Sequence, residues 1–107
     1  MLILLDESLP RKLGFLLNGH FVRTVVQMGW GGLVNGQLLR VAASAEFDVL
    51  ISGDKNMQYQ QNEASLAISV ITLIAANNRI ESFLPLVPEL LEVLAKLEEK
   101  RFYQIKI

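Results

Sequence analysis

Two short apolar runs, each followed by an acidic turn, place the strongest constraint on how this chain folds. Residues 2–5 lead directly into Asp6, and residues 49–52 lead, one glycine later, into Asp54. Apolar runs of this length that end at a polar turn are typical of strands buried on both faces of a parallel sheet. In open α/β sheets, ligands bind just beyond the carboxyl ends of the strands. We therefore expect both carboxylates to line one crevice at an edge of the sheet, where they would suit Mg²⁺ or Mn²⁺.

The rest of the chain alternates predicted helices and strands, with no linker or repeat, which indicates one domain over residues 1–107. The predicted strands are residues 2–5, 21–26, 48–52, 66–74 and 102–107. The predicted helices are residues 9–18, 37–46 and a leucine-striped segment that begins between Pro85 and Pro88, with a short helix or loop within 55–65. Short right-handed crossovers favour the strand order 2-1-3-4-5. The sequence thus predicts a three-layer α/β domain with a mostly parallel sheet.

Composition narrows the class of protein further. The chain is 51% hydrophobic, so we expect deeply buried strands or some apolar surface covered by a partner. No apolar stretch reaches about 18 residues, so no membrane span is predicted. There is no cysteine, which excludes disulfides, thiolate metal sites and cysteine nucleophiles. The opening residues lack the basic flank of a signal peptide, so we expect a cytoplasmic protein. A net charge of −1 gives no overall basic field for nucleic acid.

Four segments, in the same order along the chain, resemble the small PIN-like proteins. They are Leu-Leu-Asp-Glu-Ser-Leu-Pro at 4–10, Gly-His-Phe-Val at 19–22, Met-Gly-Trp-Gly-Gly at 28–32 and Gly-Asp-Lys-Asn at 53–56. PIN-like proteins of this size are predicted toxins of bacterial toxin–antitoxin pairs and are related to VapC-type ribonucleases. The resemblance implies a PIN-like fold, cleavage of RNA by metal-activated water, a cognate antitoxin protein as partner, and a homodimer.

The resemblance also implies the roles of particular residues. Asp6 matches the acid after the first strand, and Asp54 matches the first acid of the late motif. Asn56 stands where the family has a second late acid. These three residues are the expected ligands of Mg²⁺ or Mn²⁺, with Asp6, Asp54 and Glu7 as the catalytic set. For Glu7, an ordinary solvated turn charge is an equal alternative.

Five polar residues near these acids are candidates for holding the RNA substrate. They are the cations Arg11, Lys12 and Lys55 and the amides Gln60 and Asn62. Cations would attract phosphates, and amides would contact phosphates or base edges. The alternative interpretation is structural, because exposed cations in a first helical turn and polar loops are common.

Three other residues that often carry function are expected to be structural here. His20 is the only histidine and lies at the start of the second strand, far from the acids, so a role in the turn is expected. Trp30, in a glycine-rich loop, is expected to pack rather than to stack on a base. Asp48 begins the third strand, at the opposite end of the sheet from the crevice.

Two further functions remain open from the sequence. A receiver-like phosphoacceptor domain also needs acids after the first and third strands, and Thr72 and Lys106 would supply its hydroxyl and lysine. Thr72, however, lies within its apolar run rather than after it. The other alternative is a catalytically inactive PIN-like module that acts by binding a partner.

Overall fold

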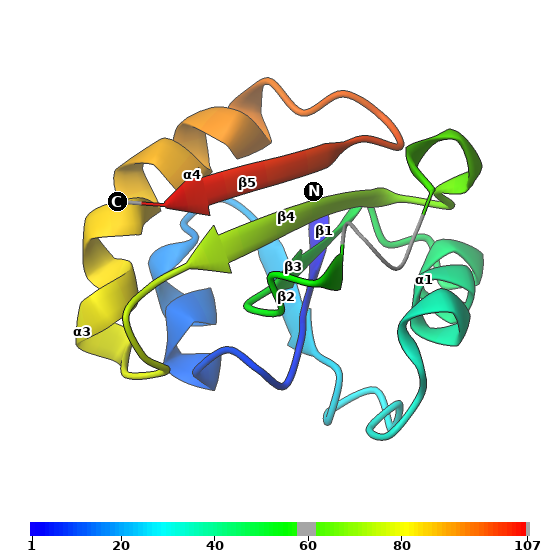
Figure 1. The fold of residues 1–107 in the computed structure, drawn as a ribbon, viewed down its shortest axis with the longest axis horizontal. Helices are drawn as coiled ribbons and strands as arrows, with labels where there is room; N and C mark the ends of the chain where they lie inside the picture. The colour runs from blue at the N-terminus through cyan, green and yellow to red at the C-terminus, as the bar shows by residue number, and fades with distance from the viewer. Residues whose placement is uncertain (58–61, 107) are drawn as a thin grey trace.

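A five-stranded sheet in which every strand is parallel to its neighbours organises the molecule (Figure 1). The computed structural model describes residues 1–57 and 62–106. The strands are β1 (Leu2–Leu5), β2 (Phe21–Thr24), β3 (Val49–Ser52), β4 (Ser69–Ile74) and β5 (Phe102–Lys106). The α-helices are α1 (Asn35–Ser44), α3 (Ile80–Phe83) and α4 (Val87–Ala95). The 3₁₀ helices are η1 (Arg11–Leu16), η2 (Glu63–Ser65) and η3 (Leu84–Leu86).

The strand order is β2-β1-β3-β4-β5, which confirms the predicted order 2-1-3-4-5. In register, Leu5 of β1 lies opposite both Thr24 of β2 and Ile51 of β3. The two strands that precede the acidic turns are therefore direct neighbours, and they end at the same edge of the sheet. This switch point is where a doubly wound sheet leaves a crevice.

Helices cover both faces of the sheet, which gives the three predicted layers (Figure 1). On one face, η1, α3, η3 and α4 bury a leucine-rich core, and on the other face α1 packs on β1, β3 and β4. The leucine stripe of the last helix is part of the first core, because Leu86, Leu90 and Leu94 are buried there. Burial on both faces explains why β3 is apolar up to its last residue.

The first predicted helix is a single 3₁₀ segment rather than an α-helix through residue 18, and Pro10 precedes it. Close packing supplies the reason. A Cβ atom built on Gly14 would lie 3.0 Å from Cγ1 of Val22 and 3.4 Å from Cδ1 of Leu5. The glycine lets η1 lie directly on β1 and β2, and it also lowers the α-helical propensity of this segment.

Several predicted boundaries also shift. The strand predicted at 21–26 ends at Thr24, and the one predicted at 66–74 begins at Ser69. The last helix begins between Pro85 and Pro88 as predicted, because α4 starts at Val87, but an unpredicted short helix, α3, precedes it and buries Phe83. Each proline then occupies the first turn of its own short helix, where no intrahelical N–H bond is lost.

The structural interpretations of Trp30 and Asp48 are confirmed. The Trp30 ring meets the Phe47 ring edge to face, with centroids 5.8 Å apart and planes at 70°. Asp48 accepts a hydrogen bond of 2.7 Å from the backbone N–H of Leu2, at the amino ends of the strands. Within residues 1–57 and 62–106, no helix has the length and apolar character needed to cross a membrane.

Candidate functional site

Asp6 lies at the centre of a hydrogen-bonded network at the carboxyl edge of the sheet. Its backbone N–H continues the ladder by donating to the Ile51 carbonyl at 2.9 Å. Its carboxylate Oδ2 accepts two hydrogen bonds, from Ser8 Oγ at 2.9 Å and from Ser52 Oγ at 2.9 Å. Among the described residues, both hydroxyls that donate to this carboxylate therefore donate to the same oxygen, Oδ2. Hydrogen bonds from two hydroxyls orient the half-buried side chain and leave Oδ1 available to a ligand.

The same two serines join the β1 turn to the β3 turn. Ser8 Oγ accepts the backbone N–H of Gly53 at 2.9 Å, and Ser52 Oγ accepts that of Asp54 at 3.0 Å. Each hydroxyl therefore donates to Asp6 and accepts a backbone N–H of the β3 turn. The approach is close, because a Cβ atom on Gly53 would lie 3.3 Å from Ser8 Oγ and 3.2 Å from Leu9 Cδ2.

Asp54 is half-buried beside this network, held by its own turn. Its Oδ1 accepts the backbone N–H of Asn56 at 2.9 Å, an arrangement in which an aspartate side chain closes a turn. Ser52 links it to Asp6 through one shared hydroxyl. The structure therefore brings Asp6 and Asp54 to one edge, as expected. Asn56 is exposed, and it contributes its backbone N–H to the turn.

Glu7 points to a different neighbour. Its Oε1 accepts the backbone N–H of Gly32 at 3.4 Å, and the side chain is exposed. This bond ties the β1 turn to the glycine-rich loop between β2 and α1. In the described part of the chain, no group of three or more His, Cys, Asp and Glu side chains is arranged to hold a metal ion. Glu7 therefore does not complete a three-acid cluster with Asp6 and Asp54.

With Glu7 set aside, Asp6 and Asp54 are the two acids at this edge that could bind one hard cation weakly. Asp6 and Asp54 supply carboxylate oxygens, the ligands that Mg²⁺ and Mn²⁺ prefer. Mg²⁺ in proteins commonly uses one or two carboxylates, keeps several waters and binds substrate phosphates. Asp6 and Asp54, whose turns are joined by the Ser52 hydroxyl, could supply those two carboxylates, whereas a site built only from protein ligands would need more donors.

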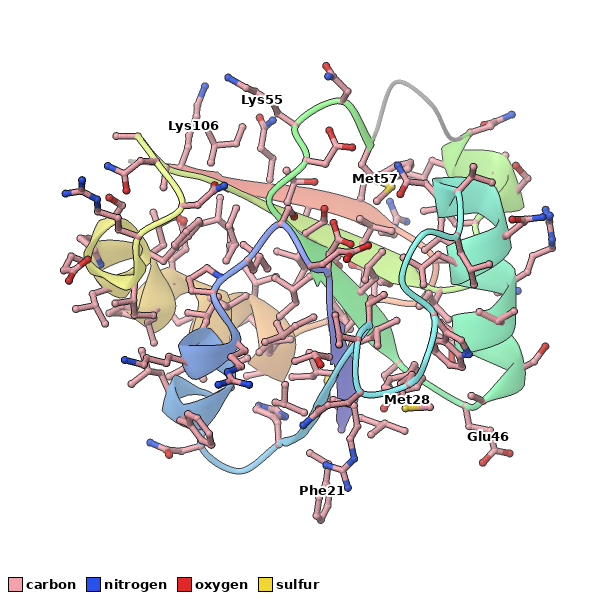
Figure 2. All side chains as sticks on the ribbon, turned by 90° about the horizontal axis from the view of Figure 1, so that it is seen from below. Phe21, Met28, Glu46, Lys55, Met57 and Lys106 are labelled. Atoms are coloured by element: carbon pink, nitrogen blue, oxygen red, sulfur yellow. The ribbon has the colours of Figure 1, made fainter. Side chains whose placement is uncertain are left out.

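The residues expected to hold substrate are spread over different places. Arg11 lies beside Asp6 and Glu7 in a groove described below, whereas Lys12 is exposed and does not line it. Lys55 is exposed next to Asp54 and projects from the same side of the molecule as Lys106 (Figure 2). Asn62 caps η2, because its Oδ1 accepts the N–H of Ala64 at 3.1 Å. Gln60 lies outside the described residues.

A groove with a volume of about 610 Å³ opens beside the site, between η1 and β2. Asp6 and Glu7 line its end at the carboxyl edge of the sheet, and His20 and Phe21 line the opposite end. Burial, and then the Met1 ammonium 3.3 Å from its Nδ1, lower the pKa of His20 below 6.5. His20 therefore lies in a turn remote from Asp54, as expected, but it also borders this groove.

Thr72 does not follow the end of its strand, as a receiver-like site requires of its hydroxyl residue. Thr72 lies opposite Ser52 in the sheet and is only 2% exposed, two residues before the end of β4. The residue that ends β3 is a serine, and the acid follows two positions later. A phosphoryl group on Asp54 would therefore find the Thr72 hydroxyl buried within the strand.

The sequence analysis missed Ser8 and Ser52, which hold Asp6. One signal was present, since Ser52 interrupts an apolar run at its last position. A serine buried to 0% exposure must have hydrogen-bond partners, and at a strand end those partners lie in the neighbouring turn.

Comparisons with family models, curated proteins and solved structures give no significant match to this chain. The geometry of the site therefore carries the functional reasoning that follows.

Proposed function

We propose that this chain is a PIN-like endoribonuclease that depends on Mg²⁺ or Mn²⁺ and hydrolyses RNA phosphodiesters at Asp6 and Asp54. One observation carries the proposal: Asp6 and Asp54 follow neighbouring strands at the switch point of a parallel sheet, and the buried Ser52 hydroxyl joins the Asp6 carboxylate to the Asp54 backbone N–H. Sites at such switch points are where α/β folds bind ligands.

The chain's own residues would divide the work as follows. Ser8 and Ser52 fix Oδ2 of Asp6, so that Oδ1 faces the ligand without rotating. Asp54, held by its turn, would supply the second carboxylate oxygen, with Asn56 or Glu7 acting through water. A divalent ion, when bound, supplies an activated water and offsets charge on the phosphate. Arg11, in the groove beside Asp6, would hold a neighbouring phosphate.

The biological role that goes with this activity is the toxin of a toxin–antitoxin pair, a proposal supported by the resemblance of residues 4–10 and 53–56 to PIN-like proteins. A cognate antitoxin, a homodimer and a cytoplasmic location belong to the same proposal.

RNA cleavage in Mg²⁺ and in Mn²⁺ tests the activity. The comparison is between the wild type, Asp6→Asn and Asp54→Asn, with Asp48→Asn as the matched control. Asp48 is the only other aspartate of the chain and lies at the far end of the sheet. We expect cleavage by the wild type and Asp48→Asn, and its loss in the other two. Cleavage that survives in EDTA or in Asp6→Asn would refute the proposal.

A second candidate is an inactive PIN-like module that binds a partner. The observation that favours it is that the described residues hold two acids, not three, around the site. Folded wild-type protein that cleaves no RNA with either metal, and binds no Mn²⁺ by calorimetry, would establish this candidate in place of the nuclease.

A further inference from the structure

The groove between η1 and β2 combines three features, and the proposed active site uses only its end, at Asp6, Glu7 and Arg11. It contains exposed aromatic rings, arginines that form no ion pair with any described carboxylate, and a direct opening to Asp6 and Glu7. The residues that line it and carry the argument are Asp6, Arg11, Phe15, Phe21, Arg23 and Val26.

Its apolar side chains are unusually exposed. Phe15 is 82% exposed, Phe21 70% and Val26 66%, and these are the three most exposed large apolar side chains among the described residues. Figure 2 shows Phe21 projecting freely, at the opposite end of the molecule from Lys55 and Lys106. Exposure of two phenylalanine rings costs solvation free energy, so a ligand that covers them is expected.

Its cations are available as well. In the described part of the chain, neither Arg11 nor Arg23 forms an ion pair, and Arg23 Nη1 donates only to the Val22 carbonyl at 3.1 Å. Phe21 and Arg23 are two residues apart on β2 and share its exposed face, and Arg11 and Phe15 both lie on η1. Aromatic rings interleaved with arginines along one groove are typical of surfaces that bind single-stranded nucleic acid.

The backbone of β2 argues against a peptide strand as the occupant. Residues 21 and 25 donate toward β1, so Val22 and Thr24 present the outer edge of this strand. The Thr24 N–H donates to Gln27 Oε1 at 2.9 Å, and the Thr24 carbonyl accepts the Met28 N–H at 3.2 Å. The Val22 carbonyl is occupied by Arg23. An added strand would find most of this short edge already bonded.

We propose that the groove binds single-stranded RNA, with bases stacked on Phe15 and Phe21 and phosphates held by Arg11 and Arg23, and leads the strand to Asp6. This inference rests on the proposed function, because it assigns the substrate track of that same site. The strand would run alongside β2, about 10 Å from Phe21 to Thr24 at 3.3 Å per residue, which accommodates a few nucleotides.

Binding measured without catalysis tests the track separately from the chemistry. The probe is a fluorescein-labelled oligoribonucleotide of about eight nucleotides, and its anisotropy is followed in EDTA so that no metal-dependent cleavage occurs. The variants are Phe21→Ala and Arg23→Ala. Leu84→Ala and Arg40→Ala are the matched controls, since both residues are exposed and lie away from the groove.

We expect Phe21→Ala to weaken binding by about tenfold while leaving the salt dependence unchanged, because stacking carries no charge. Arg23→Ala should weaken binding and reduce the slope of log affinity against log salt by about 0.7, the value for one phosphate contact on a single strand. The two control variants should bind like the wild type. Both groove substitutions are at exposed positions, so thermal melts should be unchanged.

Binding by Phe21→Ala and Arg23→Ala that equals the controls would overturn the inference, and so would no measurable binding by folded wild type. If light scattering shows a wild-type dimer that Phe21→Ala makes monomeric, with unchanged RNA affinity, the groove is instead a protein interface. Failure of cleavage in Mg²⁺ and Mn²⁺ while binding still depends on Phe21 and Arg23 would refute the proposed activity alone.

Discussion

Replacing Ser52 with alanine tests the hydrogen-bonded network around Asp6 most directly. The hydroxyl is fully buried, donates to the Asp6 carboxylate at 2.9 Å and accepts the Asp54 N–H at 3.0 Å. A bond to a charged group contributes about 1.5–3 kcal/mol and a neutral one about 0.5–1.5 kcal/mol. Asp6 keeps Ser8 as a donor and is half-buried, so water replaces part of the loss. We therefore expect Ser52→Ala to lower the free energy of unfolding by about 2–3 kcal/mol.

Urea denaturation followed by the fluorescence of Trp30 measures this loss. Trp30 is the only tryptophan and packs against Phe47, so its emission reports unfolding of the core. At an m-value of about 1–3 kcal/mol per molar urea, the midpoint should fall by about 0.7–3 M. Ser44→Ala, on the exposed end of α1, is the control and should change stability by no more than about 0.5 kcal/mol.

A double-mutant cycle shows whether Ser52 acts through Asp6. Because the two side chains bond to each other, Ser52→Ala and Asp6→Ala together should destabilise less than the sum of the single variants, by about 1 kcal/mol or more. Strict additivity, or a Ser52→Ala variant as stable as Ser44→Ala, would refute the role assigned to this hydroxyl.

Three further outcomes follow from local contacts. Gly53→Ala should destabilise by about 1–3 kcal/mol because its Cβ would lie 3.3 Å from Ser8 Oγ, and a melt unchanged from wild type would contradict that. Burial and a nearby ammonium lower the pKa of His20 below 6.5, so the folded protein binds fewer protons than the unfolded chain. The free energy of unfolding should therefore decrease as pH falls through 6.5 toward the pKa of the folded state. NMR titration of the ring should give a midpoint below 6.5. Asp48→Ala should cost about 1–2 kcal/mol in urea denaturation by leaving the Leu2 N–H without its acceptor, with RNA cleavage retained.

Much of the fold follows from sequence because the apolar runs are short, unbroken and separated by turns. Four-residue runs buried on both faces admit few structures besides central parallel strands, and right-handed crossovers then leave few strand orders. Helix boundaries were less predictable, because they depend on distant contacts. The sequence of Arg11–Leu16 predicts an α-helix, and only the close packing of Gly14 on Val22 in the structure explains the 3₁₀ helix that forms instead. Phe83 likewise turns inward from a segment that resembles a loop.

The candidate site was predictable only in its charged part. Asp6 and Asp54 each follow an apolar run, and parallel strands end at the same edge of a sheet, so the sequence places both acids at that edge without knowledge of the register. The serines require that register, since Ser52 comes beside Asp6 only because Leu5 lies opposite Ile51. The groove was harder still, because Phe15 and Phe21 look like ordinary core residues of a helix and a strand. The exposure of Phe21 depends on β2 being the edge strand, whose alternating burial leaves Phe21 and Arg23 outside.

The arrangement of charge explains why a net charge of −1 does not weigh against an RNA substrate. A site that holds a divalent ion must itself be acidic, so it repels phosphates whenever the ion is missing. Affinity for the strand must then come from elsewhere on the surface, and cations near the acids supply it most effectively if no carboxylate neutralises them. Among the described residues, no carboxylate pairs with Arg11 or Arg23, and Asp6 and Glu7 border their groove at one end. In the proposed function, this separation of charge would let the arginines bind the strand and the acids act on it, although positive and negative charges nearly cancel over the whole chain.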